Sequence, residues 1–595
     1  MCGIAGIYAY GSSAPMVDRG ELIRIRDSMT ARGPDAAGLW LSEDGRLGFA
    51  HRRLAIIDLS EGGAQPMTDP DNGNWIVFNG EIYNHNSLRS ELNKQGVVTR
   101  SHSDTEVLLK LYQIHGPAML RKLRGMFSIV IWDSKLRKMF LARDAFGIKP
   151  LYIANDGKTI RFASQVKALL QGIVDTRPDP AGHAGFFLWG SVPEPYTLYR
   201  GIRSMPPGHW MFVSEESVGK PEPFDNLTQR LTETGCASDA DVTSALERTA
   251  YAVRDSVSAH MVADVPVGVF LSAGLDSTML AACAATHGEL RTLTVGFSEY
   301  ANTEFDEAAL ASEVAAQLNA RHSVHRISAS DFLSDRAQII NAMDQPSIDG
   351  INTWFVAKAA AEQGLKVALS GLGGDELFGS YPSFMQVPKL YNRISPLTGI
   401  SVLNRAVRVG LSQISPLLPS PKYAGLLEYC GTLGGAYMLR RSLFMPWELP
   451  DLIGKEMAEQ GIQELDSVAN LANSHLGIGS DRMAVSALEM QWYMRNQLLR
   501  DADWAGMAHS LEIRVPLVDL ELLSQFTETP SLNHTEEKRQ IARIVAPELP
   551  ASILNRPKSG FAVPIHQWLN PEADVAANSH REWAQYIYKQ FTKVP

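Results

Sequence analysis

Short apolar runs separated by Gly, Asn and Asp dominate the first third of the chain. They cover residues 2–10, 48–57, 75–78, 126–132, 138–142 and 151–153. Closely spaced runs of this kind are typical of β-strands in packed sheets. Two stretches, 18–29 and 105–115, instead repeat apolar residues with helical spacing. The pattern therefore predicts sheets covered by helices.

From about Val242 the pattern changes to longer helices that alternate with short, wholly apolar strands. The strands are expected at 267–271, 293–297 and 366–369, as in a parallel sheet buried on both faces. After Gly379 the chain is mostly helical, and segment 206–241 is polar and punctuated by Pro. We therefore expect an N-terminal domain at 2–205, a linker at 206–241 and a doubly wound α/β domain with a helical C-terminal part at 242–595.

The composition is that of a globular protein with more than one domain. The 595 residues are 45% apolar and 20% charged, which leaves no room for a largely disordered chain. Lys and Arg number 55 against 65 Asp and Glu, a net charge of −10. The absence of a global basic field argues against nucleic acid as a partner.

Four cysteines without a CxxC pair predict neither a disulfide framework nor a cysteine zinc site, and they suit a reducing compartment. The N-terminus lacks the basic and apolar regions of a signal peptide, and no apolar run is long enough to span a bilayer. We therefore expect a soluble, cytoplasmic protein without a membrane partner, processed only by removal of Met1.

Removal of Met1 would leave Cys2 with both a thiol and a free α-amine. An α-amine with a pKa of about 8 can take the proton of a thiol with a pKa of about 8.5, so the pair forms a nucleophile with its own base. The alternative for a lone cysteine is a small buried residue that opens a strand.

Six short motifs occur in the first quarter of the chain, and the first of them contains this cysteine. They are Cys2-Gly3-Ile4-Ala5-Gly6, Arg32-Gly33-Pro34-Asp35, His51-Arg52-Arg53-Leu54, Phe78-Asn79-Gly80-Glu81-Ile82-Tyr83-Asn84, Ser103-Asp104-Thr105-Glu106 and Ala142-Arg143-Asp144. Together they resemble the glutaminase domain of class II amidotransferases, and closely that of the asparagine synthetase B family. The resemblance implies an Ntn-hydrolase-type αββα sandwich that takes glutamine as its substrate.

The resemblance also implies a role for each polar residue of these motifs. Cys2 would attack the glutamine side-chain amide, and Arg53 would hold the α-carboxylate. Asn79 and Gly80 would form the oxyanion hole, and Asp104 with Glu81 nearby would bind the α-ammonium. The structural alternatives are a hairpin turn at Asn79-Gly80 and an ordinary helix N-cap at Asp104.

A phosphate-binding loop is expected after the strand at 267–271. Ser272-Ala273-Gly274-Leu275-Asp276-Ser277 precedes a helix at 278–287, so backbone N–H groups and a helix N-terminus would face an anion. The loop lacks the Lys of the ordinary P-loop and resembles the PP-loop of ATP pyrophosphatases. ATP would bind at Ser272, Gly274 and Ser277, with Mg²⁺ on Asp276. Taken alone, the loop also fits a simple helix cap.

Later motifs support the nucleotide site. Ser370-Gly371-Leu372-Gly373-Gly374-Asp375-Glu376 follows another short apolar strand, and Asp375 would be a second Mg²⁺ ligand beside ATP-binding Ser370 and Gly371. Arg556-Pro557-Lys558-Ser559-Gly560-Phe561 matches the family's late Lys-x-Gly-Phe, so Lys558 would neutralise the pyrophosphate leaving group. The adenine would lie near Phe270, Val295 and Gly371 by analogy. The segments 501–503 and 507–516 also match the family, and we interpret them as mainly structural.

The two halves together imply one reaction. A carboxylate is a poor electrophile and must be adenylated, while ammonia in neutral water is mostly unreactive ammonium. The resemblance, which spans nearly the whole chain, implies an ATP-dependent carbon–nitrogen ligase that hydrolyses glutamine. Ammonia would pass through a water-poor interior passage to the adenylated acid, giving the amide, AMP, pyrophosphate and glutamate. Aspartate is the acceptor by family default.

The chain departs from the family at several positions. Leu372 stands where asparagine synthetases carry a Glu that acts in amide formation, and 344–353 differs from the usual Asp-Glu-Pro-Phe-Ala-Asp-Ser-Ser. Both changes fall beside the expected acceptor pocket, so the acceptor is either aspartate or another acid, such as a uronic acid of a surface polysaccharide or a natural-product carboxylate. Ala273 replaces a PP-loop Gly, and Gln165 replaces a Glu.

Two further functions fit the same architecture. A β-lactam-synthetase-like cyclase would have no use for Cys2, Arg53, Asn79 and Asp104, so the intact set argues against it. A catalytically inactive regulatory relative would not need Asp276, Asp375 and Lys558. The family also suggests a homodimer.

Overall fold

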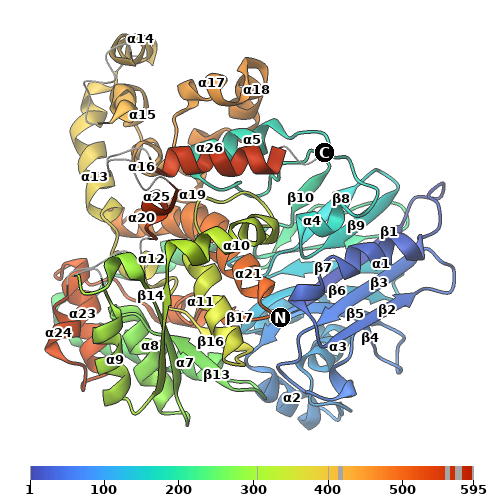
Figure 1. The fold of residues 1–595 in the computed structure, drawn as a ribbon. Helices are drawn as coiled ribbons and strands as arrows, with labels where there is room; N and C mark the ends of the chain where they lie inside the picture. The colour runs from blue at the N-terminus through green and yellow to red at the C-terminus, as the bar shows by residue number, and fades with distance from the viewer. Residues whose placement is uncertain are drawn as a thin grey trace.

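The computed structural model describes residues 2–303, 306–399, 401–412, 420–556, 563–569 and 579–592. The N-terminal part contains two six-stranded antiparallel sheets (Figure 1). The first has the order β10 (Ile202–Ser204), β8 (Tyr152–Asn155), β9 (Thr159–Ala163), β1 (Gly3–Ala9), β3 (Leu47–Arg53), β2 (Ala36–Leu41). The second has the order β12 (Glu222–Pro223), β11 (His209–Val213), β7 (Lys138–Arg143), β6 (Gly125–Asp133), β5 (Trp75–Ile82), β4 (Met67–Thr68).

Alternating side chains of these strands build an αββα sandwich. In β1, Ile4 and Tyr8 join the core between the two sheets, whereas Ala5 and Ile7 face the other way because successive side chains of a strand point to opposite faces. The outward face packs on α1 (Arg19–Asp27) and α4 (Val166–Leu169). The outer face of the second sheet packs on α2 (His85–Lys94) and α3 (Asp104–His115). The predicted sandwich is confirmed.

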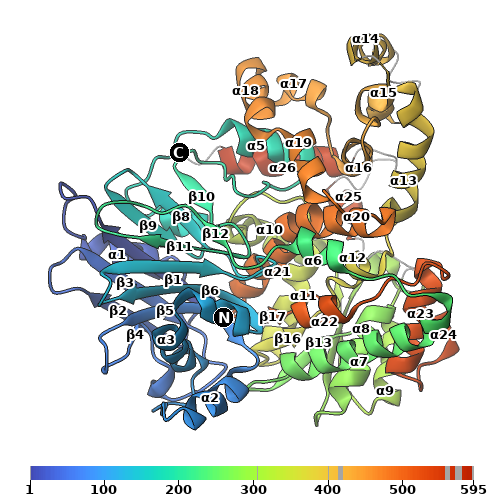
Figure 2. The same cartoon turned by 180° about the vertical axis from the view of Figure 1, so that it is seen from behind.

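The C-terminal part is built on a five-stranded parallel sheet. Its order is β15 (Arg321–Ile327), β14 (Arg291–Phe297), β13 (Val267–Phe270), β16 (Val367–Leu369), β17 (Glu512–Arg514). One face is covered by α7 (Val242–His260), α8 (Leu275–Ala285) and α9 (Ala308–Gln317). The other is covered by α10 (Ala329–Ala342) and α11 (Ile351–Glu362) (Figure 2). The chain order reverses between β13 and β16, the position where open α/β sheets form a ligand crevice.

A helical region covers the upper edge of this sheet in Figure 1. Its helices before the π-helical segment η10 (Glu489–Leu499) are α12 (Gly374–Phe378), α13 (Ser383–Ile394), α14 (Ser401–Ser412), α15 (Leu426–Tyr429), α16 (Leu433–Arg441), α17 (Pro450–Ile453), α18 (Lys455–Leu465), α19 (Ser467–Ser474) and α20 (Asp481–Leu488). Those after it are α21 (Arg500–Ala508), α25 (Ile565–Leu569) and α26 (Ser579–Thr592). Helices α22 (Leu520–Gln525), α23 (His534–Val545) and α24 (Ala551–Leu554) instead lie beside α7 and α8 on the first face of the sheet. Among the described residues, no helix combines the length and the apolar character needed to cross a bilayer.

The structure differs from the sequence-based expectation at 206–241. Strand β11 lies in this segment and pairs with β7, so Met211 and Val213 belong to the N-terminal core. The segment also holds β12 and α6 (Leu227–Glu233). Its polar residues reflect the exposed edge of a sheet rather than a linker along its whole length. Strand β17 is another element that the mostly helical pattern after Gly379 conceals, because it is only three residues long.

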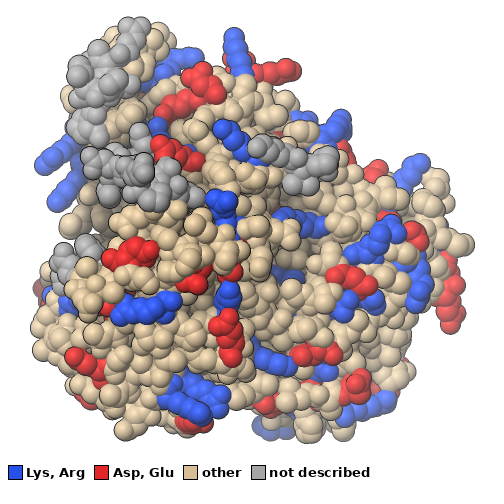
Figure 3. Space-filling view, viewed as in Figure 1, with Lys and Arg blue, Asp and Glu red and all other residues tan. Residues whose placement is uncertain are grey.

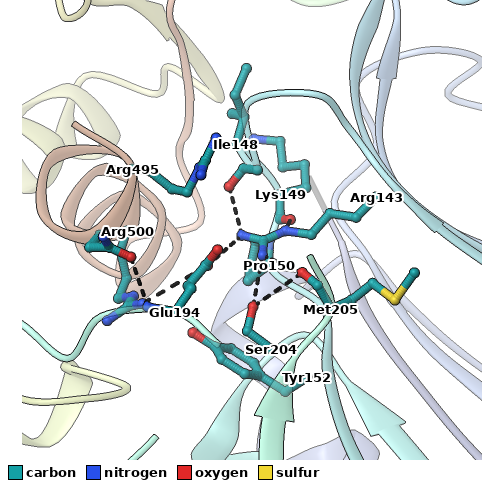
Figure 4. A network of polar contacts seen from close by, with 12 residues as sticks. Arg143, Ile148, Lys149, Pro150, Tyr152, Glu194, Ser204, Met205, Arg495 and Arg500 are labelled. Carbon is teal, nitrogen blue, oxygen red and sulfur yellow. Dashed lines mark hydrogen bonds and ion pairs between the residues drawn. The ribbon is translucent and has the colours of Figure 1, made fainter. Parts of the chain in front are cut away.

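Buried ion pairs join the two parts of the chain. Arg143 donates to the backbone carbonyls of Gly147, Lys149 and Met205, and its guanidinium lies 2.9 Å from a Glu194 carboxylate oxygen (Figure 4). Arg500 from α21 lies 3.9 Å from the same oxygen. Burial alone would raise the pKa of Glu194, but the two arginines bring it below its usual value. The chain before β10 is thereby held against the helices of the C-terminal part.

A second buried pair lies closer to Cys2. The Arg32 guanidinium bonds both carboxylate oxygens of Asp503 on α21, at 2.6 and 3.0 Å, and its Nε donates to the Cys2 carbonyl at 3.2 Å. The side chains are 1% and 8% exposed. Bidentate pairing of this kind fixes orientation as well as distance.

Loss of one member of this pair should destabilise the protein. R32M leaves the Asp503 carboxylate buried without its cation, so we expect the free energy of unfolding to fall by about 3–5 kcal/mol, and the double variant R32M/D503L to recover most of the loss. Denaturant unfolding measures both. R177M, which removes the exposed partner of Asp175, is the matched control and should change the free energy by less than about 1 kcal/mol. An R32M effect no larger than that of R177M would contradict the structural importance of the pair.

Candidate active site

The first site lies where β1 begins beside β5. The Cys2 backbone N–H donates to the Asn79 Oδ1 atom at 2.9 Å, and both residues are buried. The Asn79 Nδ2 atom is also buried and makes no hydrogen bond with any described residue. A buried amide donor without a partner is costly unless a ligand accepts from it. Burial raises the pKa of the Cys2 thiol, so the thiol stays protonated until a base removes its proton.

Asn79 and Gly80 lie inside a strand and not in a hairpin turn. They pair with Ser128 and Phe127 of β6, which corrects the turn alternative. A Cβ atom at Gly80 would lie 2.1 Å from the Met126 carbonyl oxygen. The close approach of β6 therefore requires glycine here, and it fixes the direction of the neighbouring amide groups.

Arg53 ends β3 on the same side of the sandwich. Its guanidinium donates to the carbonyls of Ser60 (2.8 Å) and Asp58. A Cβ atom at Gly63 would lie 2.1 Å from its Nη2 atom. These backbone contacts hold the planar cation in one orientation, as recognition of a carboxylate requires.

Two buried carboxyl groups lie near the end of β5, Glu81 within the strand and Asp104 at the start of α3. The Asp104 side chain accepts from the Ile82 N–H at 3.1 Å, whereas the N-cap of α3 is Ser103, so Asp104 is not the cap. The Glu81 Oε2 atom lies 3.6 Å from the guanidinium of Arg514. Burial raises the pKa of both carboxyl groups, and Glu512 raises that of Glu81 further. A cationic ligand would relieve this cost.

The second site lies at the carboxyl end of the parallel sheet. The loop after β13 is closed by the hydroxyl groups of Ser272 and Ser277, which are 2.9 Å apart, and the Gly274 N–H donates to the Ser272 Oγ atom. Ala273 is buried and is not among the residues with positive φ. Its Cβ atom therefore fits the loop, and the departure from Gly is tolerated.

The loop after β16 packs directly on the first loop. A Cβ atom at Gly374 would lie 2.3 Å from the Asp276 Oδ1 atom, so glycine permits the approach of the two loops. A cavity of about 620 Å³ opens between them. Its lining includes all the described residues that the sequence assigned to ATP and Mg²⁺, namely Phe270, Ser272, Gly274, Asp276, Ser277, Val295, Ser370, Gly371 and Asp375. Lys558 lies outside the described residues.

Lys538 on α23 joins the two predicted metal ligands. Its Nζ atom lies 2.6 Å from the Asp276 Oδ2 atom and 3.1 Å from the Asp375 Oδ1 atom. Burial would lower the pKa of Lys538, but the two carboxylates raise it above its usual value. Among the described residues, no group of three or more His, Cys, Asp and Glu side chains is arranged to hold a metal ion. Two carboxylates fit Mg²⁺ that takes its remaining ligands from phosphate and water.

Sequence reasoning missed Lys538 although a signal was present. Lys538, Ile541, Ala542 and Val545 follow the helical spacing of one face, and all four are buried. A single cation on an otherwise apolar face needs a buried partner. The identity of that partner depends on loops far away in the sequence.

The far end of the cavity is lined by hydroxyl, amide and carboxyl groups. These are Asp349, Asn352, Thr353, Tyr381, Tyr493 and Asp501, with Leu372 beside them. Burial raises the pKa of Asp501 to about 8, with a further contribution from Asp349. The Arg441 guanidinium lies 4.7 Å from the centre of the Tyr381 ring and 4.0 Å from that of Tyr493, which fixes both rings. Of segment 344–353, residues Asp349, Gly350, Asn352 and Thr353 line the cavity together with Leu372. The Gln165 side chain lies elsewhere and does not cap the helix that follows it.

Comparison with known proteins matches two families in tandem. The family described as glutamine amidotransferase domain matches residues 1–224, and the family described as asparagine synthase matches residues 248–592. A glutamine-hydrolysing asparagine synthetase 1 of Bacillus subtilis is 31% identical over 599 residues, covering 99% of this chain and 90% of the relative. A putative asparagine synthetase of Mycobacterium tuberculosis is 33% identical and covers 98% and 90%.

More distant similarities cover less of the chain. Asparagine synthetase B of Escherichia coli is 30% identical over 403 residues, covering 65% of this chain and 66% of the relative. Among solved structures, a glutamine phosphoribosylpyrophosphate amidotransferase of Bacillus subtilis superposes with a TM-score of 0.29 at 16% identity, covering 63% of this chain and 77% of that one.

Replacement of Lys538 should separate the two sites. We expect K538M to lower pyrophosphate release from ATP roughly 100- to 1000-fold, because the buried cation between Asp276 and Asp375 is lost. Hydrolysis of glutamine by the same variant, measured as glutamate release, should change little because that site lies in the other domain. Equal losses of both activities would contradict a local role for Lys538. R539M, which removes the neighbouring cation of the cavity lining, is the matched control.

Proposed function

The chain belongs to the asparagine synthase family, and we propose that it transfers the amide nitrogen of glutamine to a carboxylate that it first adenylates with ATP. The observation that supports this proposal is that Asp276 and Asp375 both form ion pairs with the Lys538 ammonium group inside the cavity. Two facing carboxylates with a lysine between them suit a Mg²⁺-bound triphosphate that loses pyrophosphate. The products are the amide, glutamate, AMP and pyrophosphate.

In the glutaminase half, Cys2 is the proposed nucleophile. Once Met1 is removed, the Cys2 α-amine would take the thiol proton, since burial disfavours the free thiolate. The unpartnered Asn79 Nδ2 atom and the Gly80 N–H would stabilise the tetrahedral oxyanion. Arg53 would hold the α-carboxylate of glutamine, and Glu81 with Asp104 would hold its α-ammonium.

In the synthetase half, the two loops would hold ATP. The hydroxyl groups of Ser272 and Ser277 and the N-terminus of α8 suit the phosphates. Phe270 and Val295 offer apolar surface to the adenine. Asp276 and Asp375 would bind Mg²⁺, which supplies charge neutralisation at the phosphates. Lys538, together with Lys558, would stabilise the charge on the departing pyrophosphate.

The acceptor end favours a hydroxylated acid over aspartate. Aspartate carries an α-carboxylate that needs a cation, yet the described cations of the cavity lining already have carboxylate partners. Lys538 lies between Asp276 and Asp375, and Arg539 lies 3.9 Å from a Glu536 carboxylate oxygen. Arg556, which lines the cavity elsewhere, lies 3.1 Å from a Glu307 carboxylate oxygen. The hydroxyl groups of a sugar acid could donate to Asp349 and accept from Tyr493, whereas the Tyr381 hydroxyl already donates to Glu376 at 2.9 Å. We therefore propose a uronic acid or a similar polyhydroxy acid, with aspartate as the second candidate on the evidence of the relatives.

The role of Cys2 is tested by the nitrogen source. We expect C2A to abolish amide formation from glutamine while amide formation from added ammonia continues, because only the release of ammonia needs the thiol. Mass spectrometry of the amide product measures both reactions. C236A, at an exposed cysteine, is the control. If C2A left product formation from glutamine unchanged, a cyclase of the β-lactam synthetase type would be the better interpretation.

The acceptor is tested by pyrophosphate release. We expect a uronic acid to stimulate release from ATP, Mg²⁺ and glutamine more strongly than L-aspartate does, relative to a reaction without acceptor. Stronger stimulation by aspartate would make the protein an asparagine synthetase in which Leu372 is a tolerated variation. Failure of every acid in a panel of uronic and amino acids would favour an inactive relative.

A further inference from the structure

One arm of the helical region stands apart from both sheets. It consists of α13, the turn η6 (Ser395–Leu397) and α14, and we refer to these elements together as the arm. In Figures 1 and 2, α14 lies at the outer tip of the molecule and α13 runs along its edge. The inner face of α14 packs on α15 and on the segment Pro421–Gly425. Its other face is open to solvent.

The open face of the arm is unusually apolar. Leu397, Val402 and Leu403 are 65%, 77% and 59% exposed. Val402, Ala406 and Val409 are spaced as one stripe along α14, and all three are exposed. Soluble surfaces carry single apolar residues without consequence, but a contiguous exposed stripe on an amphipathic helix marks a binding surface.

The charge of the arm is opposite to that of the whole chain. No Asp or Glu occurs between Glu376 and Glu428, although the net charge of the protein is −10. Lys389, Arg393 and Arg405 are exposed and form no ion pair with any described residue. Figure 3 shows basic side chains projecting at the edge of the molecule over α13. These cations are therefore free to meet an anionic surface.

We propose that the arm docks the protein on the surface of an anionic lipid bilayer. A short amphipathic helix with apolar residues on one face and basic residues beside them lies in the headgroup plane without spanning the membrane. The sequence predicted no membrane partner because no apolar run could span a bilayer, but docking on a membrane surface needs no such run. A bilayer satisfies both the apolar stripe and the unpaired cations, since lipid supplies hydrocarbon and negative charge together.

A second copy of this chain is a poorer occupant of the same face. A symmetric dimer through the arm would place Arg405 and its basic neighbours against their own copies. The arm contains no carboxylate to relieve this repulsion. Charge complementarity therefore favours lipid.

The arm begins beside the cavity. Helix α13 begins two residues after Tyr381, which lines the acceptor end of the cavity. Its 12 residues span about 18 Å at 1.5 Å per residue. Docking itself does not depend on the proposed reaction.

Co-sedimentation with vesicles tests the docking of the full chain. We expect binding to mixed phosphatidylcholine–phosphatidylglycerol vesicles, little binding to pure phosphatidylcholine, and weaker binding at high salt. K389E/R393E/R405E should weaken binding by more than about 100-fold, at roughly fivefold per removed charge. V402E/L403E should abolish it. The controls are K94E/R121E/K135E and V98E/I173E, which change exposed residues elsewhere and should bind like the wild type.

The outcomes separate docking from misfolding and from the proposed reaction. Glutamate release and pyrophosphate release by the arm variants in vesicle-free solution should equal those of the wild type, which shows that they fold. Absence of wild-type binding to anionic vesicles, or equal loss in the control variants, would overturn the proposal. A wild-type dimer that V402E/L403E converts to a monomer, without lipid binding, would assign the arm to contact between copies instead.

Discussion

The buried guanidinium of Arg514 connects the two candidate sites to one another. Its Nε atom donates to Glu512 at 2.6 Å, its Nη1 atom donates to the carbonyls of His260 and Val262, and its Nη2 atom lies 3.6 Å from Glu81. The Arg514 carbonyl accepts from the N–H of Ser370, which opens the second nucleotide loop. One residue without solvent contact thus links the end of strand β5, in the glutaminase half, to the ATP half. A cation in this position must stay paired, because an uncompensated buried charge costs several kcal/mol.

The topology of the parallel sheet explains why the nucleotide residues meet. Strands β13 and β16 are neighbours although about 100 residues of sequence separate them. The loops that follow them therefore leave the sheet at the same edge, and Gly374 allows contact between them. Because the two loops are in contact, the carboxylates of Asp276 and Asp375 can both pair with Lys538.

Charged residues are distributed unevenly over the molecule. An acidic chain carries one long segment without a carboxylate, and the fold places α14 of that segment at the tip of the molecule. The interior is also highly charged where the domains meet, because Arg32, Arg143 and Arg500 are all buried there with carboxylate partners. These interior pairs specify how the domains fit together, whereas the unpaired surface cations remain available to a partner.

The sequence by itself determined the fold class of both parts, and it proposed most of the candidate site residues. Alternation in β1 and the largely apolar runs at β13, β14 and β16 follow from local periodicity, which the printed order of residues contains in full. The motifs around Cys2 and Asp276 are local in the same sense. Only the tertiary structure decided that Lys538 bridges Asp276 and Asp375, that Arg32 pairs with Asp503, and that Asn79-Gly80 lies in a strand. These contacts join residues that are tens to hundreds of positions apart in the sequence. Which residues pair depends on which polar groups are buried together, and the spacing of residues along the chain does not reveal this. The same reason hid β11 and β17, whose short strands become recognisable only beside their neighbours in a sheet.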